Sequence, residues 1–162
     1  MAKPKKATQV REKLVRELIT SYNMEVETVL NFLCNSINLD GVRAEEIKKS
    51  LTAEIQSELA HAALLGKRIK VLGGQVPGSM GLKAGQGSLQ PLEDTTDVEA
   101  VIKGVIEAEE DAIAQYQKII ELSEQVDYVT QDMAIQLKGD EEDHRQQFVG
   151  FLKEYTRLRG KA

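Results

Sequence analysis

The sequence predicts an all-α protein, a four-helix bundle with one long crossover between its second and third helices. Three observations support this prediction. Four long segments carry apolar residues at helical spacing. Helix-forming residues such as Ala, Leu, Glu and Lys dominate the composition, and aromatic residues make up only 4%. A segment rich in Gly and Pro separates the four helices into two pairs, which is the pattern of a bundle with one crossover.

The first pair of helices is predicted over residues 8–38 and 44–72. An Asp-Gly turn at residues 40–41 ends the first helix, and the glycines at 73–74 end the second, as glycine does at many helix ends. The apolar stripes of these helices consist of Leu14, Leu18, Val29, Phe32 and Ser36 in the first, and Ile47, Leu51, Ile55, Ala62, Leu65 and Ile69 in the second.

Residues 75–96 differ in character, since they hold four glycines and two prolines. A connection of this length is uncommon inside a compact domain. Here it can run along the bundle and make the helices that flank it parallel. The third helix is expected to begin at a cap formed by Asp94 or Thr96 and to end near Ser123, and the fourth covers residues 128–158. Their stripes consist of Val98, Ile102, Val105, Ala112, Ile113, Tyr116 and Ile119 in the third helix, and Leu137, Phe148, Leu152 and Tyr155 in the fourth.

The 162 residues are expected to form one domain over residues 10–158, preceded by a basic, flexible tail over residues 1–9. A net charge of −5 argues against a general nucleic-acid or anionic-membrane surface, so DNA is not expected as a partner despite the lysines of the tail.

Without a secretory signal or an apolar stretch of ~20 residues, the protein is expected to be cytoplasmic and not bound to a membrane. Cys34 is the single cysteine, which excludes an intrachain disulfide, a zinc finger and an iron–sulfur cluster.

The chain has only two histidines, and each follows a glutamate by three positions. These pairs are Glu58 with His61 and Glu141 with His144. Residues i and i+3 share one face of a helix, so a carboxylate and an imidazole at this spacing can bind the same ion. Two such helices could hold a pair of ions between them.

Four glutamates interrupt the apolar stripes, each flanked seven positions away on both sides by another stripe residue. They are Glu25 in the first helix, Glu58 in the second, Glu109 in the third and Glu141 in the fourth. In the third helix Glu107 and Glu110 are close neighbours, but Glu107 would face solvent beside Lys103, so the helical phase favours Glu109. All four glutamates and both histidines are therefore expected to point into one core.

Ionised carboxylates inside an apolar core cost several kcal/mol each unless they are paired or bind a metal. No lysine or arginine lies on these stripes, so metal cations are the simplest solution. The two hairpins repeat the pattern, with Glu25 and Glu58 33 residues apart and Glu109 and Glu141 32 apart. Four carboxylates and two imidazoles suit two iron or manganese ions, whereas zinc prefers fewer ligands.

Other polar residues near the stripes receive simpler interpretations. Glu27, Glu54 and Glu142 are expected to be solvated charges on helix surfaces. Tyr116 is expected to pack in the core with its hydroxyl group hydrogen-bonded.

With these residues the chain resembles the ferritin-like superfamily, and within it the bacterioferritins. The block from Asp127 to Met133 and on through Asp140 to His144 carries the resemblance most clearly, and Glu25 with Asn31-Phe32-Leu33 is in the same register. The similarity spans all four helices, over roughly residues 10 to 155.

The resemblance implies two irons per subunit. Glu25 and His61 would bind one iron, Glu109 and His144 the other, and Glu58 and Glu141 would bridge them. Asp140 resembles the aspartate that orients a ligand histidine across the bundle, and Ser57 occupies the equivalent place on the second helix.

Departures from the bacterioferritin pattern limit what can be transferred. Leu59 stands where bacterioferritins carry the methionine that binds haem, so no haem is predicted, and Phe32 stands where the family often has tyrosine.

The function that the resemblance implies is that of a ferroxidase, oxidising Fe(II) to Fe(III) with O₂ or peroxide for iron storage or detoxification. Such proteins form homo-oligomeric shells of 12 or 24 subunits. The chain ends 18 residues after His144, where a bacterioferritin continues into a fifth helix. A shell of 12 subunits is therefore an alternative to one of 24. Two alternatives stay open: a di-metal peroxidase or catalase of the same superfamily, and a DNA-protecting protein of the mini-ferritin kind.

Overall fold

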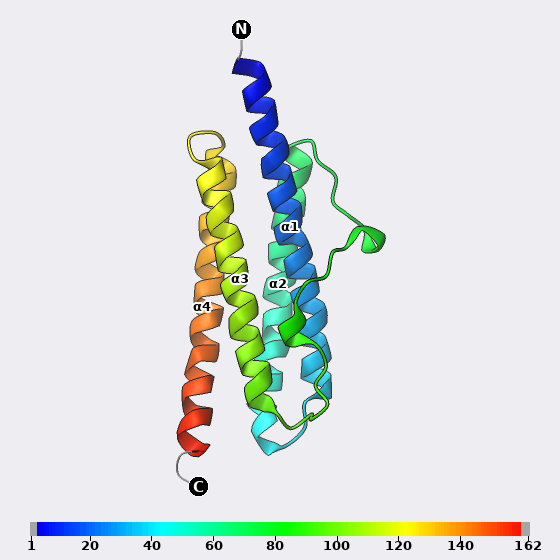
Figure 1. The fold of residues 1–162 in the computed structure, drawn as a ribbon, viewed down its shortest axis with the longest axis vertical. Helices are drawn as coiled ribbons and strands as arrows, with labels where there is room; N and C mark the ends of the chain where they lie inside the picture. Colours follow the sequence, from blue (N-terminus) through cyan, green and yellow to red (C-terminus); the bar gives the residue numbers. More distant parts are fainter. Residues whose placement is uncertain (1–2, 160–162) are drawn as a thin grey trace.

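Four long helices packed side by side form the molecule in the computed structural model, which describes residues 3–159 (Figure 1). They are α1 (Lys3–Asn38), α2 (Glu45–Val71), α3 (Val98–Ser123) and α4 (Tyr128–Arg159). Three short 3₁₀ helices lie between them, at Val42–Ala44, Ser79–Gly81 and Gly87–Leu89, and no strand occurs within the described range. The prediction of an all-α four-helix bundle is confirmed.

The crossover between α2 and α3 determines the topology. α1 packs mainly on α2 and α3 mainly on α4, so the bundle consists of two helical hairpins. The crossover starts where α2 ends and returns along the length of the bundle before α3 begins (Figure 1). As a result α2 and α3 run parallel, as the length of the Gly- and Pro-rich segment predicted.

The start of α1 differs from the prediction. The helix begins at Lys3 and not near Thr8, so residues 3–9 are helical where a flexible tail was expected, and Met1 and Ala2 lie outside the described residues. Pro4 is compatible with this start, because the first turn of a helix does not need the N–H that proline lacks.

The cap of α3 also differs from the prediction. The Asp97 carboxylate accepts a hydrogen bond from the Ala100 N–H at 3.1 Å, which is the geometry of an N-cap. Asp94 instead accepts the backbone N–H of Thr96 and closes the turn that precedes the helix.

The apolar core consists of two layers with a polar level between them. One layer contains the stripe residues Phe32, Leu51, Ile102 and Phe148, and the other contains Leu18, Leu65, Tyr116 and Ala134. These eight residues are the neighbours, seven positions away, of the four stripe glutamates. Because seven residues make nearly two helical turns, the glutamates of all four helices meet at one level, between the two layers.

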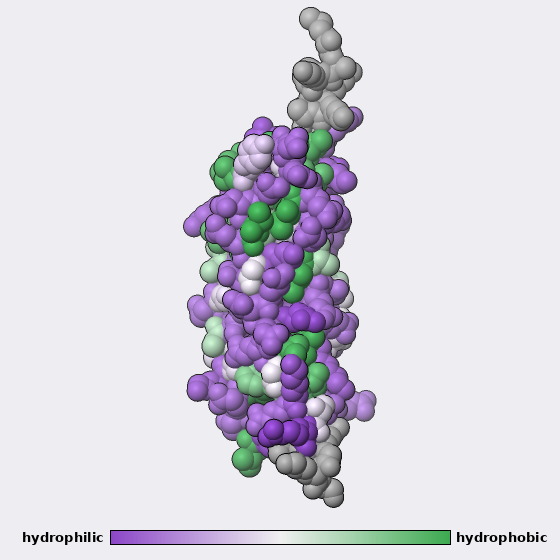
Figure 2. All heavy atoms as spheres, turned by 90° about the vertical axis from the view of Figure 1, so that its left-hand side faces the viewer, coloured by the Kyte–Doolittle hydropathy of each residue, from purple (hydrophilic) through white to green (hydrophobic). Residues whose placement is uncertain are grey.

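The outer surface is mostly hydrophilic on the side that carries α4, where apolar patches are small and interrupted (Figure 2). Among the described residues, no helix combines the length and the apolar character that a membrane span requires.

The crossover is attached to α1 by buried polar side chains. Both oxygens of the Glu27 carboxylate accept the Gly85 N–H, at 2.7 and 2.8 Å, and one also accepts the Gln86 N–H at 2.8 Å. Asn31 donates to the Gln86 side chain at 2.9 Å, and Asn35 donates to the backbone carbonyl of Leu89 at 2.8 Å. Glu27 is only 6% exposed, so the expectation that it is a solvated surface charge is wrong. The sequence pattern of α1 could not show that a distant loop covers this face.

A glycine permits the crossover to approach α3 closely. A Cβ atom on Gly104 would lie 2.5 Å from the backbone oxygen of Ser88. Only glycine fits here without displacing the loop, because a contact this short is repulsive.

We expect the Glu27→Gln substitution to loosen the crossover. It removes the charge from hydrogen bonds that are worth about 1.5–3 kcal/mol when one partner is ionised. Hydrogen exchange of the backbone amides of residues 85–86 should become faster, with little change in the centre of α3. Glu107→Gln on the exposed face of α3 is the matched control and should leave that exchange unchanged. Equal protection in both variants would show that Glu27 does not hold the loop.

Candidate metal centre

The six predicted residues come together at the polar level between the two apolar layers. Glu25 projects from α1, Glu109 from α3, the pair Glu58 and His61 from α2, and the pair Glu141 and His144 from α4. The four glutamates are at most 2% exposed, and His61 is 4% exposed. The structure therefore brings all six side chains into one cluster, as the helical phase predicted, and only the His144 side chain, at 13% exposed, is not fully buried.

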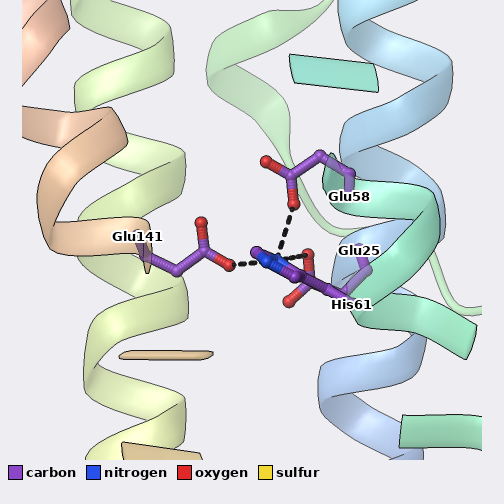
Figure 3. Close-up of side chains that lie close together, drawn as sticks. All are labelled: Glu25, Glu58, His61 and Glu141. Carbon is purple, nitrogen blue, oxygen red and sulfur yellow. Dashed lines mark hydrogen bonds and ion pairs between the residues drawn. The ribbon is translucent and has the colours of Figure 1, made fainter. Parts of the chain in front are cut away.

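The first half of the centre is built around His61 (Figure 3). Its Nδ1 atom lies 2.9 Å from Glu141 Oε1, 3.5 Å from Glu58 Oε2 and 3.8 Å from Glu25 Oε2. One potential ligand atom of each of these four residues lies within 4.8 Å of the others. Three carboxylates and one imidazole nitrogen thus point at a common volume in which an ion could be bound.

The second half is built around His144 and mirrors the first. His144 Nδ1 lies 3.1 Å from Glu141 Oε2 and 3.4 Å from Glu58 Oε1. Together with Glu109, these residues form a second group whose ligand atoms also lie within 4.8 Å of one another. The imidazole rings of His61 and His144 are nearly parallel, with centroids 6.0 Å apart. Glu58 and Glu141 belong to both groups, so they have the placement required of bridging carboxylates.

Each histidine also contacts a carboxylate outside the cluster through its second ring nitrogen. His61 Nε2 lies 3.3 Å from Asp140 Oδ2, and His144 Nε2 lies 2.9 Å from Glu54 Oε2. Such contacts fix the ring so that Nδ1 faces the centre. Asp140 was expected in this role. Glu54 was not, and the interpretation of Glu54 as a solvated charge is wrong.

Glu54 orients His144, whereas Ser57, at the place on α2 equivalent to Asp140, has no carboxylate for this role. Glu54 lies one helical turn before Glu58 on α2, and its side chain is 14% exposed, against 57% for Asp140. The i, i+4 spacing from Glu58 was visible in the sequence. What the sequence could not show is that His144, on another helix, lies opposite that position.

Tyr116 borders the centre from α3. It is 1% exposed, and its hydroxyl group donates a hydrogen bond to Glu25 Oε1. The prediction of a buried tyrosine with a bonded hydroxyl is confirmed. The bond orients the Glu25 carboxylate, so that Oε2 is the oxygen that faces His61.

The electrostatics of the cluster are those of crowded, buried carboxylates. Burial, and then the nearby Glu58 and Glu141, raise the pKa of Glu25 well above its usual value, and burial with the same two neighbours does so for Glu109. Burial also raises the pKa of Glu58, but hydrogen bonds with His144 and His61 outweigh burial and lower that pKa to about 2.

The histidines carry the compensating positive charge. Burial disfavours the imidazolium form of His61, but hydrogen bonds to Glu141, Glu25 and Glu58 outweigh burial and raise its pKa to about 12. The pKa of His144 is likewise raised, against the effect of burial, by hydrogen bonds to Glu141, Glu54 and Glu58. At neutral pH the cluster therefore holds protons at positions where metal ligands would have to be deprotonated.

The cluster fits a pair of metal ions better than it fits protons alone. No ion pair of these six residues involves a lysine or an arginine in the described part of the chain. Glu109 Oε1 is buried and accepts no hydrogen bond. A buried oxygen without a partner costs about 1–3 kcal/mol or more, which a bound cation would offset. Carboxylate oxygens with one imidazole per site suit iron or manganese.

We expect divalent metal binding to release protons and to strengthen as the pH rises. The raised pKa values of Glu25, Glu109 and both histidines mean that a metal ion must displace protons, and lower pH supplies more of them. Anaerobic calorimetric titration with Fe(II), in two buffers of different ionisation enthalpy, should show release of about one proton or more per ion. A binding heat that does not depend on the buffer would contradict this protonation state.

Replacing Glu54 with Gln should weaken the metal site of His144 more than that of His61. The substitution removes the carboxylate that fixes the ring, a change that typically costs about 10–100-fold in affinity. Competition with a coloured chelator would measure the two sites as separate steps. Glu46→Gln, on the exposed first turn of α2, is the matched control. Equal affinities in the variant and the native protein would exclude the orienting role.

Comparison with known proteins agrees with this geometry. Residues 16–158 match the family described as the ferritin-like domain. No curated protein sequence matches the chain. Among solved structures, a dodecameric thioferritin, the bacterioferritin-related protein from Bacteroides fragilis, has a TM-score of 0.80 at 18% identity and covers 97% of this chain and 98% of its own.

Two further solved structures have the same fold. The bacterioferritin of Desulfovibrio desulfuricans, described with a diiron site in different catalytic states, has a TM-score of 0.78 at 19% identity over 94% of this chain and 85% of its own. The DPS protein of Vibrio cholerae has a TM-score of 0.80 at 19% identity over 90% and 92%. At these identities the structures establish the fold alone. Because the family match extends over most of the chain, the protein belongs to the ferritin-like domain family.

Proposed function

We propose that this protein is a ferroxidase, which binds two Fe(II) ions per subunit at the candidate metal centre and oxidises them to Fe(III) for iron storage or detoxification. The observation that supports this most directly is the sharing of Glu58 and Glu141 between the two ligand groups. Ions that share two carboxylates lie close enough together to pass two electrons to one oxidant molecule. The D. desulfuricans bacterioferritin, which has the same fold, is described with a diiron site, and this supports the proposal.

The ligand set follows from the two groups. Glu25 and His61 would hold one Fe(II), Glu109 and His144 the other, and Glu58 and Glu141 would contact both. Four carboxylates balance the charge of two divalent ions, which makes the loaded centre tolerable in a low-dielectric core. Manganese would fit the same donors.

The electron balance requires an oxidant that accepts electrons in pairs. Two Fe(II) ions lose one electron each, and O₂ with two protons becomes H₂O₂, or H₂O₂ with two protons becomes two waters. The protons displaced when Fe(II) binds are available close by, since His61 and His144 each contact a carboxylate outside the cluster. Asp140 is more than half exposed and provides contact with solvent on the His61 side.

Substituting either shared carboxylate should abolish the reaction. We expect Glu58→Ala and Glu141→Ala to slow the oxidation of two Fe(II) equivalents per subunit by about 100-fold or more, because each removes one of the two carboxylates that would contact both ions and fix their separation. Stopped-flow absorbance of Fe(III) formation would measure this rate. Glu142→Ala, on the exposed side of α4, is the control and should retain the native rate.

The proposal fails if Fe(II) oxidation stays fast in both variants while circular dichroism shows an intact bundle. Measuring peroxide consumption and Fe(III) accumulation distinguishes the proposed storage function from a di-metal peroxidase or catalase. A di-metal peroxidase or catalase would consume peroxide over many turnovers without storing Fe(III), whereas a storage protein would accumulate iron.

We further propose that the subunits assemble into a homo-oligomeric shell. On α1, Leu30, Leu33 and Ile37 are 53%, 47% and 68% exposed and recur at helical spacing, so they form one apolar row. Contiguous exposed apolar rows are typical of protein–protein interfaces. The B. fragilis relative is described as a dodecamer, which supports assembly as a shell here.

The double substitution Leu33→Glu with Ile37→Glu should break the assembly. Charges placed on both sides of a self-associating surface repel and lose apolar burial, so light scattering after size-exclusion chromatography should show smaller species. Ile135→Glu, which replaces an exposed apolar residue on α4, is the matched control. A monomeric native protein, or an unaltered mass in the double variant, would contradict the assignment.

A further inference from the structure

The two halves of the candidate metal centre are built alike but are not identical. We call the group of Glu25 and His61 with the two shared carboxylates the Glu25 site, and the group of Glu109 and His144 with the same carboxylates the Glu109 site. The hairpins that carry them repeat one pattern, a glutamate followed by the Glu-x-x-His pair. A difference in side-chain chemistry between the two halves therefore points to a difference in what each half does.

The repeat includes one aromatic residue in each hairpin, and only one of the two carries a hydroxyl group. Phe32 follows Glu25 by seven positions on α1, and Tyr116 follows Glu109 by seven positions on α3. The two rings are equally buried, at 0% and 1% exposed. The hydroxyl group is thus the main difference between them.

The two rings have equivalent places in the bundle. Tyr116 lies in one apolar layer with Leu18, and Phe32 lies in the other layer with Ile102. Leu18 and Ile102 each precede the stripe glutamate of their own helix by seven positions. Because α1 and α3 run in opposite directions (Figure 1), each ring flanks the glutamate of the opposite hairpin in the same way.

Only the Glu25 carboxylate is held by its aromatic neighbour. The Tyr116 hydroxyl donates to Glu25 Oε1, which leaves Oε2 facing His61. Glu109 Oε1, in contrast, is buried and accepts no hydrogen bond, and Phe32 has no hydroxyl to donate. A carboxylate that is already fixed by a hydrogen bond loses less freedom when it binds a metal. Glu25 is therefore a preorganised ligand, and Glu109 is not.

The histidines do not reverse this difference. The second ring nitrogen of each contacts a carboxylate, at 3.3 Å for His61 and 2.9 Å for His144. Their orientation therefore differs only in degree, whereas the glutamates differ by the presence of a hydrogen bond. The His144 side chain is also 13% exposed, against 5% for His61, so the Glu109 site is the more open to solvent.

We propose that Tyr116 is a positioning residue that makes the two metal sites unequal. The ion in the Glu25 site binds more tightly and is retained, and the ion in the Glu109 site exchanges with the solution. This inference rests on the metal binding of the proposed function but not on iron oxidation. The centre would then keep one ion while the other leaves for storage.

The first test uses Co(II), so that iron oxidation plays no part. Crystals of the protein loaded anaerobically with one Co(II) per subunit would give anomalous peaks at the cobalt absorption edge. We expect the peak in the Glu25 site to be several times higher than the peak in the Glu109 site. The double variant Phe32→Tyr with Tyr116→Phe moves the hydroxyl group to the opposite ring, and it should transfer the higher peak to the Glu109 site.

A solution measurement on a single variant keeps the proposal testable if the double variant does not fold. Release of two Co(II) per subunit to a chelator should show a fast and a slow phase of equal amplitude in the native protein. Tyr116→Phe, which removes one oxygen atom, should accelerate the slow phase by about 10–100-fold. Tyr155→Phe is the matched control and should change neither phase, because the hydroxyl it removes donates to the Arg43 backbone carbonyl outside the centre.

The outcomes separate this proposal from the ferroxidase function. Equal peaks, a higher peak in the Glu109 site of the native protein, or an unchanged slow phase in Tyr116→Phe would overturn this proposal alone. So would a higher peak that stays in the Glu25 site of the double variant. Co(II) bound at neither site would overturn both proposals. Unequal Co(II) sites without fast Fe(II) oxidation would overturn the ferroxidase function and support this proposal.

Discussion

The structure depends on keeping four carboxylates at one level of an apolar core. Charges taken out of water cost several kcal/mol each unless opposite charges compensate them. No lysine or arginine among the described residues pairs with these carboxylates, so the compensation comes from the two imidazoles and from the raised pKa values of Glu25 and Glu109. This arrangement stores protons where a pair of divalent ions would bind. The same residues can thus tolerate a metal-free state and still be ready for metal.

The apolar layers on either side of the cluster make it possible to hold these groups so close together. Each stripe glutamate is flanked, seven positions away, by residues of both layers, so the packing fixes all four helices in a common register. Outside the cluster, Tyr116, Asp140 and Glu54 orient Glu25, His61 and His144. All three contacts cross between the two hairpins: Tyr116 reaches from α3 to α1, Asp140 from α4 to α2, and Glu54 from α2 to α4. The centre therefore links the two hairpins.

Helical periodicity was enough to predict the four helices and the six residues of the cluster, because each depends on spacing within one helix. The Gly- and Pro-rich composition of residues 75–96 predicted the crossover. The interpretations that proved wrong concern contacts between distant segments. Glu27 looked like a surface charge because nothing in α1 reveals that Gly85 and Gln86 cover it. Glu54 looked solvated because its partner, His144, lies on another helix. The cap of α3 shifted to Asp97 because Asp94 is engaged in the preceding turn.

The most direct test of this account is an anomalous-difference map at the iron absorption edge, from crystals loaded anaerobically with Fe(II). The account predicts two peaks in each subunit, one beside Glu25 and His61 and the other beside Glu109 and His144, with Glu58 and Glu141 in contact with both. Peaks confined to the protein surface, with the six side chains still bonded only to one another, would contradict it.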